Sequence, residues 1–255
     1  MNAQMVKQNE FRGIYLYAVV SGCKQKELGN CGVGENNVYT IVHRDLAAVV
    51  SVTSLKKVRP ERRHLAAHNA VHRRLNEVTT PLPVSFGTIA ENEVEIKKIL
   101  SLNYESFAET LQKVEDRMEM GLRVSVNVPN IFAFLVDRHP DLKRARDELA
   151  AKQGKGSREE QINLGQLFER ILEENREKFT SQVESILGPV CHEIKRLDCR
   201  DEKLIMNLAC LVSRENEKAF ERMIFEAANG FDDNYSFDFN GPFVPYNFVE
   251  LEISF

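Results

Sequence analysis

The chain has 255 residues with 34 basic and 38 acidic side chains, which gives a net charge of −4. At roughly 100 to 200 residues per domain, this length favours two domains. A hydrophobic content of 43% is typical of a globular protein with a buried core. The slightly acidic balance excludes a protein whose whole surface attracts nucleic acid. No apolar run approaches the roughly 20 residues that cross a bilayer, so we expect no membrane span.

The N-terminus and the cysteines both indicate a cytosolic protein. Residues 1–11 contain charged and amide side chains and no apolar stretch of the kind found in secretory signals. The five cysteines are odd in number and irregularly spaced, which predicts free thiols and no structural zinc.

The first half of the chain alternates strand and helix patterns. β-branched and aromatic stretches predict strands, and Pro60 is typical of a first helical position. Apolar residues recur at helical spacing after it, at Leu65, Val71, Leu75 and Val78. We expect strands over residues 15–20, 38–42 and 46–52, a helix over 60–78, a strand over 84–89, and helices over 91–117 that break near Asn103.

The second half predicts the order β, α, β, β, α, β. Strict alternation marks a half-buried strand over 122–128, and a long amphipathic pattern marks a helix over 159–187. Further strands are expected over 193–198, 204–212 and 235–239, with a helix over 214–228. This order is that of the ferredoxin-like arrangement. We therefore predict an α+β protein with a mixed α/β domain over 1–118 and a ferredoxin-like domain over 119–255 that ends in an aromatic tail.

The charge distribution supports a boundary between the two halves. Residues 1–118 hold 16 basic and 13 acidic side chains, whereas residues 119–255 hold 18 and 25. The halves therefore differ in the sign of their net charge.

Three histidines stand one helical turn apart in the helix predicted over 60–78. His64, His68 and His72 share one face, and a ring pair at this spacing is able to ligate a metal. Flanking cations disfavour a metal ion, and no catalytic Glu follows the first histidine. A plain solvated helix is the favoured interpretation. The alternative is a surface that recognises an anionic ligand through its cations, which include Arg62, Arg63, Arg73 and Arg74.

The enzymatic signatures that we sought are absent from the sequence. There is no P-loop, dinucleotide fingerprint, nucleophile elbow or HExxH motif. The glycine-rich segment 29–34 is best interpreted as a surface loop. We predict no catalytic residue, no cofactor and no metal site. Tyr15 and Tyr17 are expected in the core or on a hairpin face, and no nucleic-acid partner is predicted.

The C-terminal segment is rich in aromatic residues. Residues 231–255 contain six Phe and two Tyr, with five acidic side chains and no Lys or Arg. Packing of a terminal strand explains this composition, and an apolar, acidic surface for a partner is the alternative. Phe243, Tyr246 and Phe248 are the candidate partner-binding residues of this segment.

Several segments together resemble the gas vesicle accessory proteins of the GvpF/GvpL family, of the cyanobacterial GvpF type. The resemblance covers nearly the whole chain, and its most specific part is GPFVPYNFV at 241–249. Phe243 stands where the family often has Trp. The other segments are YLYAVV at 15–20, LAAVVS at 46–51, HN at 68–69, LPVSFGT at 82–88 and NLACLV at 207–212.

The resemblance implies a non-enzymatic, minor structural or assembly component of gas vesicles in the cytoplasm. Its implied partners are the small hydrophobic shell protein and other vesicle accessory proteins, and it implies two α+β domains. The competing hypothesis is a cytosolic module that binds an anionic ligand through the basic helix over 60–78. Salt dependence separates the two, because contacts to phosphate-like groups weaken with ionic strength and apolar contacts do not.

Overall fold

The computed structural model describes residues 12–22, 27–152 and 156–255. It is an α+β structure with two antiparallel sheets, one of six strands and one of four. The chain divides into two compact units: the first contains residues 1–119 and 242–255, and the second contains residues 120–241. The N-terminal residues 1–11, which carry the expectation about a secretory signal, lie outside the described part. Within the described part, no helix is both long and apolar enough to cross a bilayer.

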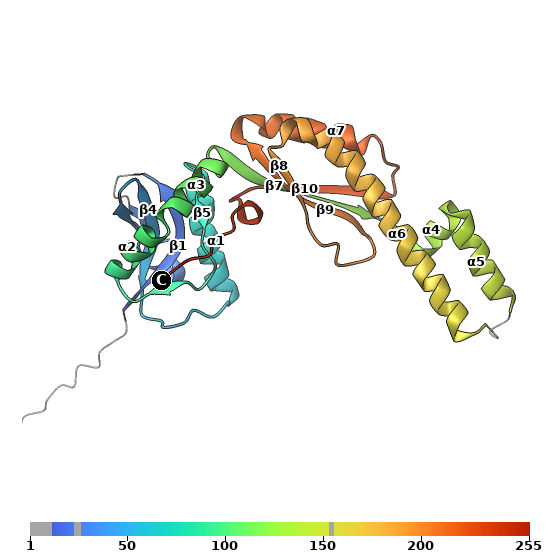
Figure 1. Ribbon diagram of the computed structural model, residues 1–255, viewed down its shortest axis with the longest axis horizontal. Coiled ribbons are helices and arrows are strands. Elements are labelled where there is room, and N and C mark those ends of the chain that lie inside the picture. Colours follow the sequence, from blue (N-terminus) through green and yellow to red (C-terminus); the bar gives the residue numbers. More distant parts are fainter. Residues whose placement is uncertain (1–11, 23–26, 153–155) are drawn as a thin grey trace, which may run out of the picture. The chain divides into compact units, whose positions relative to one another are not determined.

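The first unit contains the six-stranded sheet and three α-helices (Figure 1). Its strands are β1 (Gly13–Ser21), β2 (Glu27–Gly29), β3 (Val38–His43), β4 (Leu46–Thr53), β5 (Leu82–Pro83) and β6 (Ile89–Ala90). Its helices are α1 (Arg62–Asn76), α2 (Glu93–Leu102), α3 (Tyr104–Val114) and the 3-10 turns η1 (Val33–Glu35) and η4 (Tyr246–Phe248).

Strand β1 lies in the middle of this sheet. The strand order is β2-β3-β4-β1-β5, and β6 also pairs with β1. Strands β3 and β4 form the predicted hairpin, in which Arg44 adopts a φ of 56° at the turn. Because helices pack on both faces of the sheet, every residue of β1 from Gly13 to Val20 is buried. Burial on both faces explains why the sequence of β1 is apolar throughout, without alternation.

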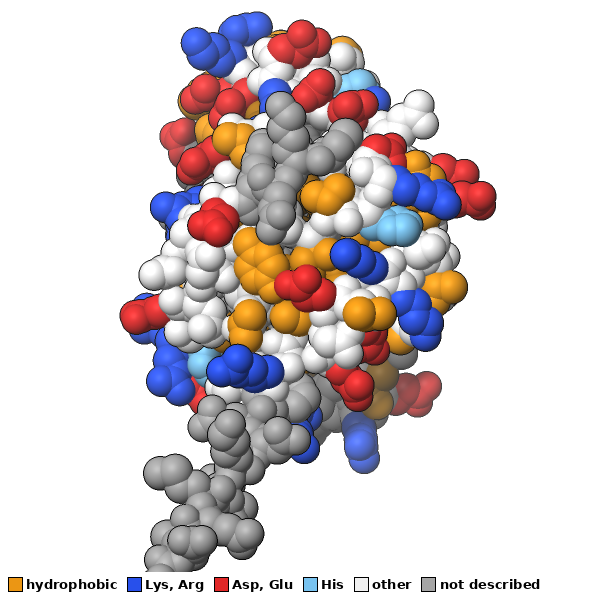
Figure 2. Space-filling view, turned by 90° about the vertical axis from the view of Figure 1, so that its left-hand side faces the viewer, with side chains coloured by type: hydrophobic (Ala, Val, Ile, Leu, Met, Phe, Trp, Pro, Cys, Tyr) orange, Lys and Arg blue, Asp and Glu red, His pale blue; other side chains and the backbone are white. Residues whose placement is uncertain are grey.

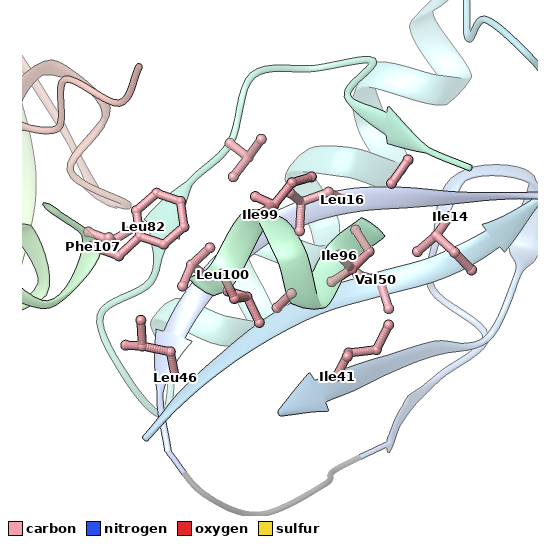
Figure 3. Close-up of a cluster of buried hydrophobic side chains, with 14 of the residues drawn as sticks. Ile14, Leu16, Ile41, Leu46, Val50, Leu82, Ile96, Ile99, Leu100 and Phe107 are labelled. Carbon is pink, nitrogen blue, oxygen red and sulfur yellow. The ribbon is translucent and has the colours of Figure 1, made fainter. Parts of the chain in front are cut away.

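One face of the sheet packs against α2 and α3. Figure 3 shows Ile96, Ile99 and Leu100 of α2 directed at side chains of the strands, among them Leu16 and Val50. Asn103 ends α2, and its side chain is buried. The predicted break near Asn103 is therefore confirmed.

The other face packs against α1. A β-bulge shifts the register of β1 against β4 between Leu16 and Ala18, so Tyr17 has no direct partner. A bulge places two consecutive side chains on one face of a sheet. As a result Tyr15, Tyr17 and Ala18 all belong to the cluster beneath α1, while Leu16 and Val19 belong to the opposite cluster.

The strand predicted over 84–89 is wrong for residues 84–88, and only its last residue, Ile89, lies in a strand. The chain forms a turn there, with Gly87 at a φ of 89°, between the two short strands β5 and β6. Val84 is buried and Phe86 and Ile89 are partly buried in this stretch, which does not require strand geometry. Both short strands pair with β1, and the backbone of Val84 also donates a hydrogen bond to the carbonyl of Tyr17.

The second unit contains the four-stranded sheet, in the order β10-β7-β9-β8. Its strands are β7 (Arg117–Val126), which begins within the first unit, β8 (Glu193–Arg196), β9 (Leu204–Ser213) and β10 (Tyr235–Phe243). Its helices are α4 (Ile131–Arg138), α5 (Pro140–Ala151), α6 (Arg158–Leu187) and α7 (Glu217–Ala228), with the 3-10 turns η2 (Gly188–Val190) and η3 (Arg214–Asn216).

Helix α6 is the longest element of the second unit. A capping box starts it: the Ser157 hydroxyl accepts from the Glu160 backbone, and the Glu160 carboxylate accepts from the Ser157 backbone. Its apolar face packs against α4, α5 and β9. The helix predicted over 159–187 is confirmed.

The position of the C-terminal tail differs from the expectation of one continuous domain over 119–255. Residues 242–255 belong to the first unit. Val249, Leu251 and Ile253 pack against the cluster between the first sheet and α2 and α3. The pairing that keeps β10 in the second sheet ends at Phe243, and burial of these apolar side chains holds the remainder against the first unit.

The close approach of Gly32 to Tyr17 generates a stability prediction. A Cβ on Gly32 would lie 2.6 Å from the Tyr17 hydroxyl oxygen and 2.9 Å from the Asn36 carbonyl oxygen. We expect Gly32→Ala to lower the free energy of unfolding of the first unit by about 1 to 3 kcal/mol, because backbone and a buried ring would have to move. Thermal unfolding measures this change.

Gly165 provides the matched control for this substitution. It lies within α6, and a Cβ there would meet nothing within 4 Å. Gly165→Ala should leave stability unchanged or raise it by up to about 1 kcal/mol, because alanine favours the helix. Equal unfolding temperatures for the two variants would contradict the predicted packing at Gly32.

Candidate partner-binding surface

The basic helix and the aromatic tail, which the sequence suggests as separate candidates, meet in the first unit. The Tyr246 hydroxyl of the tail lies 2.6 Å from Nδ1 of His72 on α1. One turn further along α1, the Asn76 amide donates to the carbonyl of Pro242 at 3.5 Å. The tail segment, defined here as residues 242–255, therefore docks beside α1.

The three histidines of α1 face the sheet, so the expectation of a plain solvated helix is wrong for them. His64, His68 and His72 are 9%, 2% and 3% exposed. Val71 and Leu75 complete the same inward face, whereas Leu65 and Val78, which the sequence places on the apolar face, are exposed. Strand β1 explains why the rings point inward. The Tyr15 hydroxyl and the Tyr17 carbonyl face α1 and form hydrogen bonds with the histidines, which apolar side chains could not form.

His72 bridges the tail segment and β1. Its Nε2 lies 2.8 Å from the backbone carbonyl of Tyr17, which only accepts, so Nε2 carries the proton. In the neutral ring Nδ1 is then an acceptor, and the Tyr246 hydroxyl donates to it. We assign this tautomer from the hydrogen-bond partners.

His68 extends the same network to Tyr15 and Gly87. The Gly87 amide donates to the Tyr15 hydroxyl at 2.9 Å, and this hydroxyl donates to His68 Nδ1 at 3.1 Å. His68 Nε2 lies 3.4 Å from the hydroxyl oxygen of Tyr246. Donors and acceptors therefore alternate along a series of hydrogen bonds that runs from the Gly87 amide to the Tyr17 carbonyl. Within this series the Tyr246 hydroxyl links the two histidines.

Burial keeps these groups neutral. Loss of solvation and, to a smaller extent, the neighbouring His72 together lower the pKa of His68 to about 3, although a hydrogen bond to the Val84 backbone acts in the opposite direction. Burial also lowers the pKa of His72, against its hydrogen bond to the Tyr17 backbone. The same loss of solvation raises the pKa of Tyr15 to about 12 and raises the pKa of Tyr246.

Two further polar side chains hold the tail segment. The Glu119 carboxylate accepts from the backbone and the side-chain amide of Asn247, at 2.9 and 2.6 Å. The Asn103 amide donates to the Ser254 carbonyl and accepts from the Ser254 backbone, each at 3.0 Å. Sequence reasoning missed both. The sequence does contain one sign of the Glu119 contact, because Glu119 is an acidic side chain in an otherwise apolar part of β7.

The candidate aromatic residues of the tail segment have different surroundings. Phe248 is only 3% exposed and contributes to the core, so its expected place on an exposed surface is corrected. Phe243 is 45% exposed. Tyr246 is exposed over part of its ring while its hydroxyl is engaged by the histidines.

The four candidate arginines lie on the outer side of α1 and are exposed. Arg63 pairs with Glu61 at 2.9 Å, and Arg74 donates to the carbonyl of Leu28 at 2.8 Å. Arg62 and Arg73 are the other two. Figure 2 shows one face of the molecule, on which basic, acidic and hydrophobic side chains are interspersed.

Metal-ligating side chains do not cluster in the described part of the chain. Within 12–22, 27–152 and 156–255, no cluster of three or more His, Cys, Asp or Glu side chains could hold a metal ion. A cavity of about 490 Å³ lies beside α1, with Cys31, Glu35 and His64 in its lining. His64 Nδ1 is 3.0 Å from the Arg59 carbonyl, so this ring is held by the backbone.

The chain is similar to known proteins of one family. A model described as "Gas vesicle synthesis protein GvpL/GvpF" matches residues 13–250. Gas vesicle protein F of Nostoc sp. is 27% identical over 242 residues, covering 94% of this chain and 98% of the relative. Gas vesicle protein F2 of Halobacterium salinarum is 26% identical over 246 residues, covering 94% and 93%.

Two crystal structures are also similar. Gas vesicle protein GvpF from Anabaena sp. superposes with a TM-score of 0.83 at 27% identity, over 94% of this chain and 99% of that chain. GvpF from Microcystis aeruginosa gives a TM-score of 0.79 at 22% identity, over 94% and 99%, and supports the fold alone.

The neutral histidines predict how stability changes with pH. An unfolded histidine binds a proton below its ordinary pKa of about 6.5, whereas folded His68 does so only near its pKa of about 3. The unfolded state therefore holds more protons in this window, and stability falls as pH falls through it. From pH 7 to 5.5 we expect His68 alone to cost about 1 kcal/mol.

Urea unfolding followed by tyrosine fluorescence measures this slope, since five of the six tyrosines lie in the first unit. His68→Asn should reduce the loss of stability between pH 7 and 5.5. The matched control is His192→Asn, because His192 is exposed and bonds the Ser213 hydroxyl. An unchanged slope in His68→Asn would contradict the assignment.

The hydroxyl of Tyr246 is expected to fix the tail segment on α1. Tyr246→Phe removes the donor to His72 Nδ1 and leaves that buried nitrogen without its partner, a cost of about 1 to 3 kcal/mol. Faster hydrogen exchange over 244–255, with exchange in α6 unchanged as the internal control, is the expected result. Identical exchange over 244–255 in wild type and variant would disprove the role of this hydroxyl.

Proposed function

Because the chain belongs to the gas vesicle GvpL/GvpF family, we propose that it is a non-enzymatic accessory protein of gas vesicles. In this proposal it acts at the vesicle within the cytoplasm. It binds the small hydrophobic shell protein, together with other vesicle accessory proteins, and limits aggregation of shell subunits during assembly. The observation that carries the proposal is the exposed aromatic surface that the tail segment holds beside the basic side of α1.

Two properties of the tail segment support this role: its aromatic side chains are exposed, and hydrogen bonds hold them in place. Phe243 is exposed, yet the carbonyl of the preceding residue, Pro242, accepts from Asn76 of α1. Tyr246 presents part of its ring while its hydroxyl is hydrogen bonded. Aromatic side chains that are already fixed lose little conformational entropy when they bind a partner. An apolar subunit prone to aggregation is a suitable partner for such a surface.

We also infer that the second unit has the ferredoxin-like arrangement. Two features support this inference. The order of its elements is β, α, β, β, α, β, with α4, α5 and α6 in the place of the first helix. The sheet order β10-β7-β9-β8 puts the first and third strands of the unit in the middle.

One observation favours a second candidate function, recognition of an anionic ligand by the basic helix over 60–78. The inward histidines leave the outer side of α1 to cations, and Arg62 and Arg73 are exposed there. Contacts between arginine and an anionic group weaken steeply with salt, whereas apolar contacts do not.

A pull-down of the purified full-length protein against the small vesicle shell protein, at low and at high salt, tests the proposal. We expect binding to persist at high salt, and Phe243→Ser to weaken it about 5- to 30-fold, as loss of a buried aromatic contact of about 1 to 2 kcal/mol would. Binding that is lost at high salt would favour the anionic alternative. No binding at either salt would contradict the proposed partner.

Val94→Ser is the matched control for Phe243→Ser. Val94 is also an exposed apolar residue of the first unit, at 76% against 45% for Phe243, but it lies on α2. This control should bind the shell protein as wild type does. Phe248→Ser is unsuitable as a binding test, because Phe248 is buried and its loss would destabilise the unit.

A further inference from the structure

We propose that a cavity of the second unit binds the lysine side chain of a basic partner protein. The cavity has a volume of about 370 Å³ and is lined by residues of α6, of β9 and of the segment that follows β8. It is separate from the surface invoked in the proposed function, since the tail segment and α1 belong to the first unit. We call it the α6 cavity.

The strand β9 gives the α6 cavity an apolar wall. Ile205, Met206 and Leu208 line the cavity and are buried. Strand β8 ends at Arg196, which pairs with Leu208, so residues 204–207 of β9 have no partner in β8. A lysine side chain buries its methylene groups along such apolar surface while its ammonium reaches polar groups. The wall therefore suits the aliphatic part of this side chain.

A buried hydroxyl of the α6 cavity lacks a partner in the protein. Thr180 of α6 lines the cavity and is only 6% exposed, yet its hydroxyl forms no hydrogen bond to another residue within 12–22, 27–152 and 156–255. Buried polar groups are nearly always hydrogen bonded, so a ligand that donates a hydrogen bond would satisfy this one. Asn207 donates to the Asp198 carbonyl through its amide nitrogen, and its side-chain oxygen adds a further acceptor. An ammonium group carries three donors and no acceptor, which matches these groups.

The two arginines that line the α6 cavity already have acceptors within the protein. Arg196 donates to both oxygens of Glu184 and to one oxygen of Glu177. Each nitrogen of Arg176 likewise donates to an acceptor, one of which is the Glu173 carboxylate. Because both cations are engaged and paired with carboxylates, they offer little to an anionic ligand.

The balance of charge favours a cation in the α6 cavity. The charged side chains that line it are three acidic and two basic, and Asp198 is the acidic one that is not paired with either arginine. Burial raises the pKa of the Cys199 thiol, which Arg176 opposes and nearby carboxylates reinforce, so this lining group is uncharged at neutral pH. Residues 120–241 as a whole hold 22 acidic and 18 basic side chains. A basic partner is therefore attracted to this unit.

The first experiment titrates the full-length protein with Nα-acetyl-lysine amide. The methionine methyl groups are labelled with carbon-13, and the Met206→Leu variant identifies the NMR signal of Met206 in the cavity wall. We expect this signal to shift with a Kd of about 1 mM, which is typical of so small a ligand. A Met206 signal that stays unchanged at ten times this concentration would overturn the proposal.

Two further ligands test which part of the side chain is recognised. Nα-acetyl-norleucine amide has the same aliphatic chain without the ammonium, and it should bind at least about 10-fold more weakly. Equal affinity for the two ligands would show that the cavity recognises only the apolar chain, which would overturn the proposal. Tighter binding of Nα-acetyl-arginine amide would overturn the choice of lysine.

Two variants test the groups that would receive the ammonium. Thr180→Val removes the hydroxyl and Asp198→Asn removes the free carboxylate, and each should weaken binding of the lysine amide about 3- to 10-fold. Thr180→Val should not lower the unfolding temperature, because this hydroxyl has no partner to lose.

Asp238→Asn is the matched control, since Asp238 is an exposed carboxylate of β10 in the same unit and does not line the cavity. It should bind the lysine amide as wild type does. Unchanged affinity in both Thr180→Val and Asp198→Asn, or an equal loss in Asp238→Asn, would overturn the assignment to the α6 cavity.

Discussion

Burial of two imidazole rings under α1 is the constraint on which the first unit depends. His68 and His72 are almost completely enclosed, and each ring nitrogen that loses water must find another partner. The partners come from segments far apart in the sequence: Tyr15 and the Tyr17 carbonyl of β1, and Tyr246 of the tail segment. Satisfying these two side chains therefore fixes α1 on the sheet and brings the C-terminal residues back to the N-terminal unit.

The β-bulge in β1 prepares the strand for this arrangement. It puts Tyr15, Tyr17 and Ala18 on the side of α1, while Leu16 and Val19 remain in the opposite cluster. Tyr17 gains a hydroxyl contact to Ser51 and accepts from the Val33 backbone. The polar atoms of one strand thus hold both a helix and a loop, and its apolar atoms fill two cores.

The surface invoked in the proposed function results from this interior packing. Because the histidines point inward, the arginines of α1 lie on its outer side. The hydrogen bonds of the Tyr246 hydroxyl and of the Pro242 carbonyl hold the nearby Phe243 in place, and its side chain remains exposed. The chain belongs to the gas vesicle GvpL/GvpF family. In the proposed function its partner contacts are presented by a segment whose own attachment is polar and specific.

The amino-acid sequence by itself determined most of the elements, because periodicity and turn residues are local: the strands 15–20 and 46–52, the break near Asn103 and the helix 159–187 all agree with the structure. It also identified the basic helix and the aromatic tail as the places of interest. It did not reveal that they meet, that the histidines are core residues, or that residues 84–88 form a turn. Those features depend on partners more than 50 residues away in the chain, such as Tyr15 for His68 and His72 for Tyr246. A histidine at helical spacing has the same local pattern in water or in a core, and only the tertiary structure decides which, by supplying or withholding the hydrogen-bond partners that burial requires.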